Sequence, residues 1–209
     1  MVCWSAENAT KAYLQTMKMG KRAKEPDVAE FLSALAAGNS AQLMVEACTS
    51  TAGATTLALV AAAHQTGGRV VCILPGLEEL HSSEEALGPD ADCVEFVIGD
   101  ARILLLNDYR GADFVLIDCN LEDHEGVLRA VQAGAKNSGA VVVGYNAFCK
   151  ASWGMSGSKT QLLPIGEGLL VTRVPATTKR SRWVIRVDKC TGEEHVFRIK
   201  SSPRKNIEA

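Results

Sequence analysis

The feature that most constrains the fold of this chain is a series of five short apolar runs that alternate with helical stretches. The runs cover residues 43–48, 69–74, 94–98, 113–118 and 140–144. Continuous apolar strands that alternate with helices are typical of a parallel sheet covered on both faces. The pattern therefore predicts an α/β fold with a Rossmann-like, doubly wound, mainly parallel sheet.

The two ends of the chain follow different patterns. Helical spacing of apolar residues predicts two N-terminal helices, over 6–20 and from Pro26 to about residue 38. Three strand-like segments follow the last parallel run, over 168–174, 183–188 and 195–200, and a tight turn is expected between the last two. We therefore expect the sheet to end in antiparallel strands.

The length of 209 residues suits one domain of ordinary size. We expect a single α/β domain over 1–209, with the N-terminal helices in 1–40 and the Rossmann-like core in 41–200. The tail over 201–209 is expected to be disordered. No internal repeat or linker divides the sequence.

Charge and apolar patterning exclude two classes of partner. Lys and Arg total 22 against 24 Asp and Glu, which gives a net charge of −2 and argues against nucleic-acid binding through bulk phosphate attraction. No apolar run approaches the roughly 18 residues that a membrane span needs. We expect neither a nucleic-acid nor a membrane partner, and no secretory signal.

The cysteine pattern indicates a reducing compartment. There are seven cysteines, an odd number, and no C-x-x-C pair occurs among them. Their spacing predicts neither a zinc site nor a disulfide framework. We therefore expect a cytoplasmic protein.

A segment of small and hydroxyl residues follows the first apolar run. Ligands of doubly wound sheets bind at the carboxyl ends of the strands, and the first strand–helix loop is a common cradle. Residues 49–53 read Thr-Ser-Thr-Ala-Gly, so the backbone can approach a ligand closely, although neither G-x-G-x-x-G nor a P-loop is present. The alternative is a plain Ser/Thr-capped start of a helix.

The sequence resembles a known family at its N-terminus. The segment 4–13, WSAENATKAY, and the segment 25–31, EPDVAEF, resemble a plant family of uncharacterised proteins, and the resemblance covers nearly the whole chain. That family is similar to class I S-adenosylmethionine-dependent methyltransferases, and more distantly to the caffeoyl-CoA and catechol O-methyltransferases. The resemblance implies a possible cofactor, S-adenosyl-L-methionine, and a transferase activity.

The resemblance also implies roles for individual residues. Glu46, Thr49, Ser50 and Gly53 match the loop that holds the methionine side of the cofactor. The sequence Gly99-Asp100-Ala101 matches a motif whose Asp accepts a hydrogen bond from the adenine amino group. Asp118 matches a carboxylate close to the sulfonium. The cofactor-binding residues implied by the resemblance are Glu46, Thr49, Ser50, Gly53, Gly99, Asp100, Ala101 and Asp118.

Two positions depart from the family pattern. The second apolar run ends in Leu74-Pro75-Gly76, where the family has an acid that binds the ribose hydroxyls. After the fifth run, Asn146-Ala147 replaces the Asp-Asn pair of metal-dependent members, so we expect no divalent metal.

Two residues are candidates for a catalytic role. His124 follows the fourth apolar run, and histidine is the residue type that most often serves as a general base. Lys150 lies in the segment after the fifth run, where these enzymes bind their acceptor. For His124 the alternative is a solvated residue at the start of a helix, and for Lys150 an ordinary surface loop.

Three hypotheses about function follow. The first is a methyltransferase that acts on a small molecule, at oxygen if the O-methyltransferase likeness holds. The second is a catalytically inactive binding or scaffold protein of the same fold, which the missing ribose acid favours. The third, a nucleotide-sugar or NAD enzyme, is disfavoured because the glycine fingerprint is absent. The expected partner is an unidentified small-molecule acceptor, and a homodimer is compatible with the sequence.

Overall fold

The structure is a computed structural model that describes residues 4–19, 27–135, 139–148, 160–176, 181–187 and 194–200. The chain separates into two compact units, Met1–Ala176 and Thr177–Ala209. The first unit carries a seven-stranded sheet, and the second carries a two-stranded hairpin.

Five parallel strands form most of the sheet in the first unit, in the order β3-β2-β1-β4-β5. They are β1 (Leu43–Ala47), β2 (Arg69–Leu74), β3 (Val94–Ile98), β4 (Phe114–Asp118) and β5 (Ala140–Tyr145). Each strand coincides closely with one apolar run. The predicted doubly wound, mainly parallel sheet is therefore confirmed.

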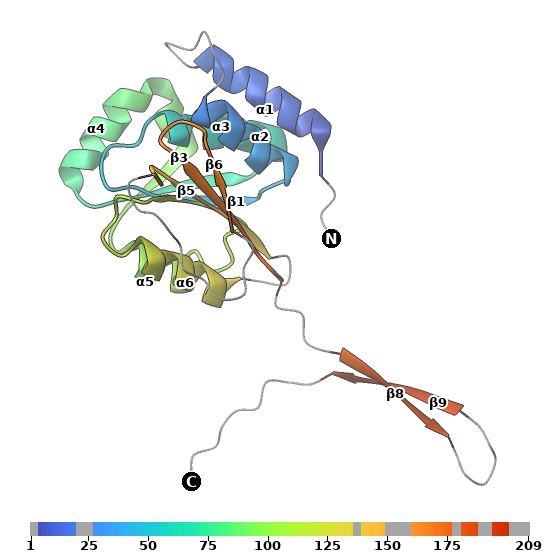
Figure 1. Ribbon diagram of the computed structural model, residues 1–209. Helices are drawn as coiled ribbons and strands as arrows, with labels where there is room; N and C mark the ends of the chain where they lie inside the picture. The colour runs from blue at the N-terminus through green and yellow to red at the C-terminus, as the bar shows by residue number, and fades with distance from the viewer. Residues whose placement is uncertain are drawn as a thin grey trace, which may run out of the picture. The chain divides into compact units, whose positions relative to one another are not determined.

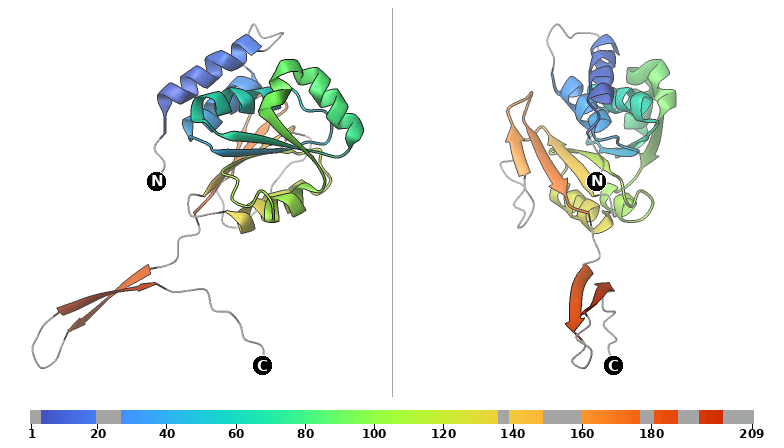
Figure 2. Two further views of the ribbon diagram at one scale, coloured as in Figure 1. Left: turned by 180° about the vertical axis from the view of Figure 1, so that it is seen from behind. Right: turned by 90° about the vertical axis from the view of Figure 1, so that its right-hand side faces the viewer.

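Helices cover both faces of this sheet, as the apolar character of the strands requires. On one face lie α1 (Ala6–Met19), α2 (Val28–Gly38), α3 (Ala54–Thr66) and α4 (Leu77–Leu87), and a 3-10 helix over Gly88–Cys93 follows α4. On the other face lie α5 (Ala101–Leu106) and α6 (His124–Gly134) (Figure 1). The view from behind in Figure 2 shows the same two layers of helix. The two predicted N-terminal helices are present as α1 and α2.

The parallel sheet ends in two antiparallel strands, one of which the sequence pattern did not reveal. β7 (Leu169–Val174) pairs antiparallel with β5, as predicted. Its other neighbour is β6 (Thr160–Leu163), not the segment 183–188. β6 is a short edge strand with largely exposed side chains, so backbone hydrogen bonds to β7 hold it in place and no apolar pattern marks it.

The hairpin of the second unit consists of β8 (Ser181–Val187) and β9 (Glu194–Lys200). The two strands pair antiparallel from Ser181–Lys200 to Val187–Glu194, as the predicted turn between them requires. They form a sheet of their own and do not join the seven-stranded sheet. The predicted tail over 201–209 lies outside the described residues.

Alternating side chains of the central strands fill two separate apolar layers. Met44 and Cys72 face the layer beneath α2 and α3, whereas Val45 and Ile73 face the layer beneath α5 and α6. All four side chains are buried. None of the described helices is both long and apolar enough to span a membrane.

One carboxylate joins the amino ends of two central strands. Asp113, just before β4, accepts hydrogen bonds from the backbone N–H groups of Gln42 (3.0 Å) and Leu43 (3.1 Å) at the start of β1. The contact therefore fixes the register of β1 against β4 across 70 residues of sequence.

We expect Asp113→Ala to lower the free energy of unfolding by about 1–3 kcal/mol, because two backbone donors lose a charged acceptor. Urea denaturation followed by circular dichroism measures this change. Glu85→Ala, which alters an exposed side chain on α4, is the control and should have little effect. Equal stability of the two variants would show that Asp113 does not fix the register.

Candidate functional site

The candidate site lies at the edge of the sheet where the parallel strands end. Crossover connections bring the carboxyl ends of β1 to β5 to this edge, and the loops that follow them meet there. Two pockets open among these loops.

The larger pocket has a volume of about 430 Å³ and lies beside the start of α3. Its walls come from the loop after β1, from the ends of β4 and β5, from the start of α2 and from the loop before β7. They include two carboxylates besides Asp118, those of Asp27 and Glu167. The full lining is Asp27, Val28, Ser50, Thr51, Gly53, Ala54, Thr55, Asp118, Tyr145, Asn146, Gly166, Glu167, Gly168 and Leu169.

Asp118, the last residue of β4, links three loops at this pocket. Its carboxylate accepts hydrogen bonds from the Thr49 hydroxyl, from the Asn120 backbone N–H (3.0 Å) and from the Asn146 side-chain amide (2.9 Å). Asn146 has a φ of 57°, a left-handed conformation that Asn tolerates better than most residues. The Asp118 side chain is therefore a fixed part of the site, although only 5% of the residue is exposed.

The smaller pocket, of about 250 Å³, lies where β1, β2 and β3 end. Gly99, Asp100 and Ala101 form one wall, and Leu74 and Pro75 form an apolar wall after β2. The remaining lining residues are Cys48, Ile73, Leu121, Glu122, Asp123 and Val127.

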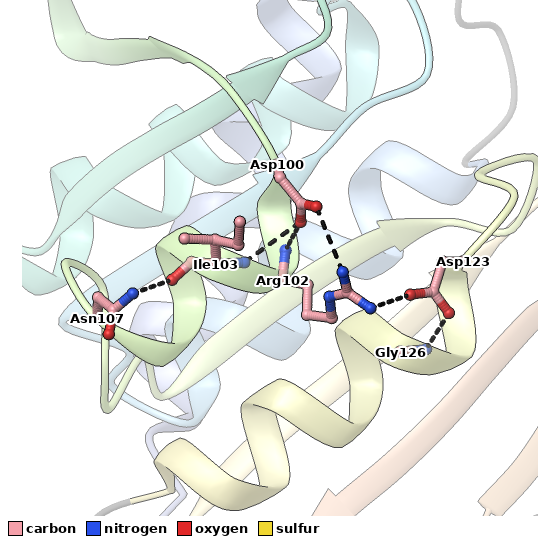
Figure 3. A network of polar contacts seen from close by, with 6 residues as sticks. All are labelled: Asp100, Arg102, Ile103, Asn107, Asp123 and Gly126. Carbon is pink, nitrogen blue, oxygen red and sulfur yellow. Dashed lines mark hydrogen bonds and ion pairs between the residues drawn. The ribbon is translucent and has the colours of Figure 1, made fainter.

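Asp100 takes part in a network of polar contacts at the rim of the smaller pocket (Figure 3). One carboxylate oxygen accepts hydrogen bonds from the backbone N–H groups of Arg102 (2.8 Å) and Ile103 (3.2 Å), so Asp100 is the N-cap of α5. The Arg102 guanidinium lies between the carboxylates of Asp100 (3.7 Å) and Asp123 (3.1 Å). These ion pairs are about half exposed, so they orient the side chains and add little stability.

Glu46 lies beneath the site and has no exposed surface. Its two carboxylate oxygens accept hydrogen bonds from the hydroxyls of Thr55 (2.6 Å) and Thr56 (2.7 Å) in the first turn of α3. Burial raises the pKa of Glu46, and these hydrogen bonds oppose the rise. Glu46 therefore joins β1 to the start of α3 and lines neither pocket.

One contact joins two of the predicted residues next to the pockets. Cys48 lines the smaller pocket, and Ser50 lines the larger one. Thr49, between them in the chain, donates its hydroxyl to Asp118. We name this the Thr49–Asp118 contact; it joins the loop after β1 to the end of β4.

The structure brings most of the predicted cofactor residues to these pockets. Ser50, Gly53 and Asp118 line the larger pocket. Gly99, Asp100 and Ala101 line the smaller one. Thr49 reaches the site through its contact with Asp118, and Glu46 supports it from below.

The structure describes one of the two candidate catalytic residues, His124. His124 is the first residue of α6, and its Nδ1 lies 2.9 Å from the backbone carbonyl of Leu121. It lines neither of the two pockets. Lys150 lies outside the described residues.

Sequence reasoning did not assign the residues of the loop after β4 to the smaller pocket. Leu121, Glu122 and Asp123 line it together with Gly99 and Asp100. Two acids four and five residues after the end of β4 were the available signal, but spacing alone does not show which pocket they line.

Only one group of potential metal ligands converges in the described part of the chain. Within it, a single set of three His, Cys, Asp or Glu side chains has ligand atoms within 4.8 Å of one another, namely Glu46, Cys48 and Cys72. Among the described residues, Asp118 therefore has no two further His, Cys, Asp or Glu side chains whose ligand atoms all lie within that distance.

Comparisons with known proteins agree with the fold. The family described as "Protein of unknown function (DUF1442)" matches residues 1–199. No curated protein matches the sequence significantly.

Solved structures of methyltransferases have the same fold at low sequence identity. One is a methyltransferase from Geobacter sulfurreducens, with a TM-score of 0.58, 19% identity and coverage of 81% of this chain and 90% of that chain. Another is an O-methyltransferase from Bacillus cereus in complex with SAH, with a TM-score of 0.55, 15% identity and coverage of 81% and 91%. A third is the O-methyltransferase TomG from Streptomyces achromogenes, which is involved in tomaymycin synthesis and was solved in complex with SAM. Its TM-score is 0.55 and its identity 19%, and the match covers 84% of this chain and 93% of that chain. The sheet is thus of the class I methyltransferase type.

We expect Asp118→Ala to lower the free energy of unfolding by about 1.5–3 kcal/mol, because the hydrogen bonds of three loops to a buried charged group are lost. Chemical denaturation of the full chain measures the change. Glu122→Ala, an exposed acid in the loop that follows, is the matched control and should stay near the wild type. If Asp118→Ala is as stable as this control, the carboxylate does not hold the loops together.

Proposed function

We propose that this chain, which belongs to the DUF1442 family, is an S-adenosylmethionine-dependent methyltransferase that acts on a small molecule, at an oxygen atom. The observation that carries the proposal is the pair of pockets at the carboxyl edge of a class I methyltransferase sheet. Solved structures with this fold carry SAM or SAH. A shared fold supports function only by association, so the residues must support it as well.

The residues at the pockets fit the chemical groups of this cofactor. Gly99, Asp100 and Ala101 in the smaller pocket would receive the adenosine, with the free lone pairs of Asp100 as acceptors for the amino group. Ser50 and Gly53, at the start of α3, would receive the methionine carboxylate, because backbone N–H groups and the helix dipole favour an anion there. A cofactor bound in this way spans both pockets.

When bound, this cofactor supplies an activated methyl group on a sulfonium. The chain's own part is to position an acceptor in the larger pocket and to keep its hydroxyl ready for attack. Asp118, at the end of β4, would place a negative charge close to the sulfonium. His124 and Lys150 stay candidate bases for the acceptor proton.

A second function is favoured by one observation. Leu74 and Pro75 present an apolar wall to the smaller pocket at the position of the expected ribose acid. A catalytically inactive binding or scaffold protein of the same fold would need no such acid. A wild type that binds no S-adenosylmethionine would favour this second function.

We expect S-adenosylmethionine and S-adenosylhomocysteine to bind the full chain in a calorimetric titration. Asp100→Ala should weaken binding about 5- to 150-fold, which corresponds to the ~1–3 kcal/mol lost with a buried hydrogen-bond partner. Asp100→Ser keeps a capping oxygen for α5 and controls for loss of the cap. If the wild type gives no measurable heat of binding at millimolar ligand, the inactive scaffold becomes the better explanation of the fold.

We further expect any methyl transfer to be unaffected by magnesium and by EDTA. At the ends of β4 and β5 the described residues provide the Asp118 carboxylate and the Asn146 amide, where the metal-dependent O-methyltransferases have a larger set of oxygen ligands, and the one described group of three converging ligands does not include Asp118. Initial rates with added magnesium and with chelator test this directly. Activity that disappears in EDTA and returns with magnesium would mean that another acid, such as Glu167, completes a metal site.

Other expectations from the sequence stay predictions. They are a cytoplasmic location, a plant source and the lack of a nucleic-acid partner, and a homodimer stays compatible with the sequence.

A further inference from the structure

A second group of chemically reactive side chains lies next to the candidate site and plays no part in the proposed transfer. Cys48 follows β1, and Cys72 lies on β2, the strand that pairs with β1. Their Sγ atoms are 3.5 Å apart, and both cysteines are free thiols. Glu46 lies on the same face of the sheet, two residues before Cys48 and opposite Cys72 in the strand register.

All three side chains are buried, and their ligand atoms lie within 4.8 Å of one another. From this convergence we propose that Glu46, Cys48 and Cys72 form a structural zinc site. Spacing along the chain predicted no zinc site, because such rules detect ligands that are close in sequence. Here the pairing of two parallel strands brings together cysteines that are 24 residues apart.

The distances fit tetrahedral zinc. Zn–S bonds of ~2.3 Å at the tetrahedral angle hold two sulfur atoms ~3.8 Å apart. The Cys48 and Cys72 sulfur atoms are already at 3.5 Å, so a small outward movement accommodates the ion. The Tyr145 hydroxyl donates a hydrogen bond to the Cys48 sulfur across 4.0 Å, so it would contact a ligating sulfur, and a solvent molecule from the smaller pocket would take the fourth position.

The surroundings of Glu46 have the form of an outer ligand shell. Ligating carboxylates in metal sites are themselves held by hydrogen bonds, which fix their orientation. The hydroxyls of Thr55 and Thr56 hold the two oxygens of Glu46 in this way, and each oxygen keeps a free lone pair. No ion pair among the described residues includes Glu46, so bound zinc would add a positive charge beside a carboxylate that only hydrogen bonds now hold.

Charge and access are also compatible with zinc. Each Zn–S bond replaces an S–H bond, so the two thiol protons pass to solvent as the ion binds. Two thiolates and one carboxylate then leave a net charge of −1 beside the start of α3, where the helix dipole favours negative charge. Cys48 lines the smaller pocket, which gives the ion a route from solvent. Two thiolates with one oxygen ligand favour zinc over magnesium or calcium.

The test uses the reduced full chain, loaded with Co²⁺ as a spectroscopic probe and with Zn²⁺ for stoichiometry. We expect one zinc per chain by elemental analysis, and cobalt–thiolate absorption in the near ultraviolet. Cys48→Ser and Cys72→Ser should each remove most of this absorption. Glu46→Gln, which keeps the shape of the side chain, should weaken zinc binding at least about tenfold, because loss of even an outer-shell partner costs 10–100-fold.

The matched control is Cys93→Ser. Cys93 is exposed, and its sulfur lies 3.8 Å from His64 Nε2, so it tests for adventitious binding by a surface Cys–His pair. This variant should bind cobalt with an unchanged spectrum. Zinc should also raise the melting temperature of the wild type, a measurement that needs no variant to fold.

Three outcomes would overturn the proposal. One is a wild type without cobalt–thiolate absorption, and another is absorption that depends on Cys93 alone. The third is a Cys48–Cys72 disulfide in the untreated protein with no zinc bound after reduction. None of these readouts depends on methyl transfer, so the zinc site and the proposed function fail or succeed separately.

Discussion

The structure of the site depends on a carboxylate that has no contact with water. Glu46 sits on the central strand β1 beneath the first turn of α3, and burying an acid there is unfavourable unless its oxygens are hydrogen-bonded. Thr55 and Thr56 meet this need with their hydroxyls, and Thr56 also accepts the Gly53 backbone N–H (3.3 Å). The start of α3 is therefore fixed over the sheet, which in turn positions the loop that lines both pockets.

The fold could be predicted from the sequence because apolar patterning reports burial directly. β4 and β5 are buried throughout apart from the half-buried Tyr145, and each was visible as an unbroken apolar run. The sequence pattern did not predict β6, because it is an exposed edge strand that is held by its pairing with β7. Nothing in the local sequence distinguishes Thr160–Leu163 from a loop. The turn pattern predicted that β8 and β9 form a hairpin. It could not show that they form a separate two-stranded sheet.

Less of the site could be predicted, because its contacts depend on strand order. Thr49 and Asp118 are 69 residues apart, and they meet only because β1 and β4 are neighbours in the sheet. Glu122 and Gly99, which are 23 residues apart, likewise line the same smaller pocket. His124 is close to Asp118 in sequence, and this suggested that the two residues share a site. In the structure the His124 ring instead contacts the Leu121 backbone carbonyl.

The Thr49–Asp118 contact holds the part of the loop after β1 that contributes to both pockets, because Cys48 lines the smaller pocket and Ser50 the larger one. A ligand that moves this part of the loop, as one that fills both pockets would, also breaks the hydrogen bond of the Thr49 hydroxyl. Part of the binding energy of the whole molecule is then used to rearrange the loop after β1, so the affinities of separate fragments do not multiply. Such a site distinguishes a complete ligand from its pieces by the loop movement that only the complete ligand produces.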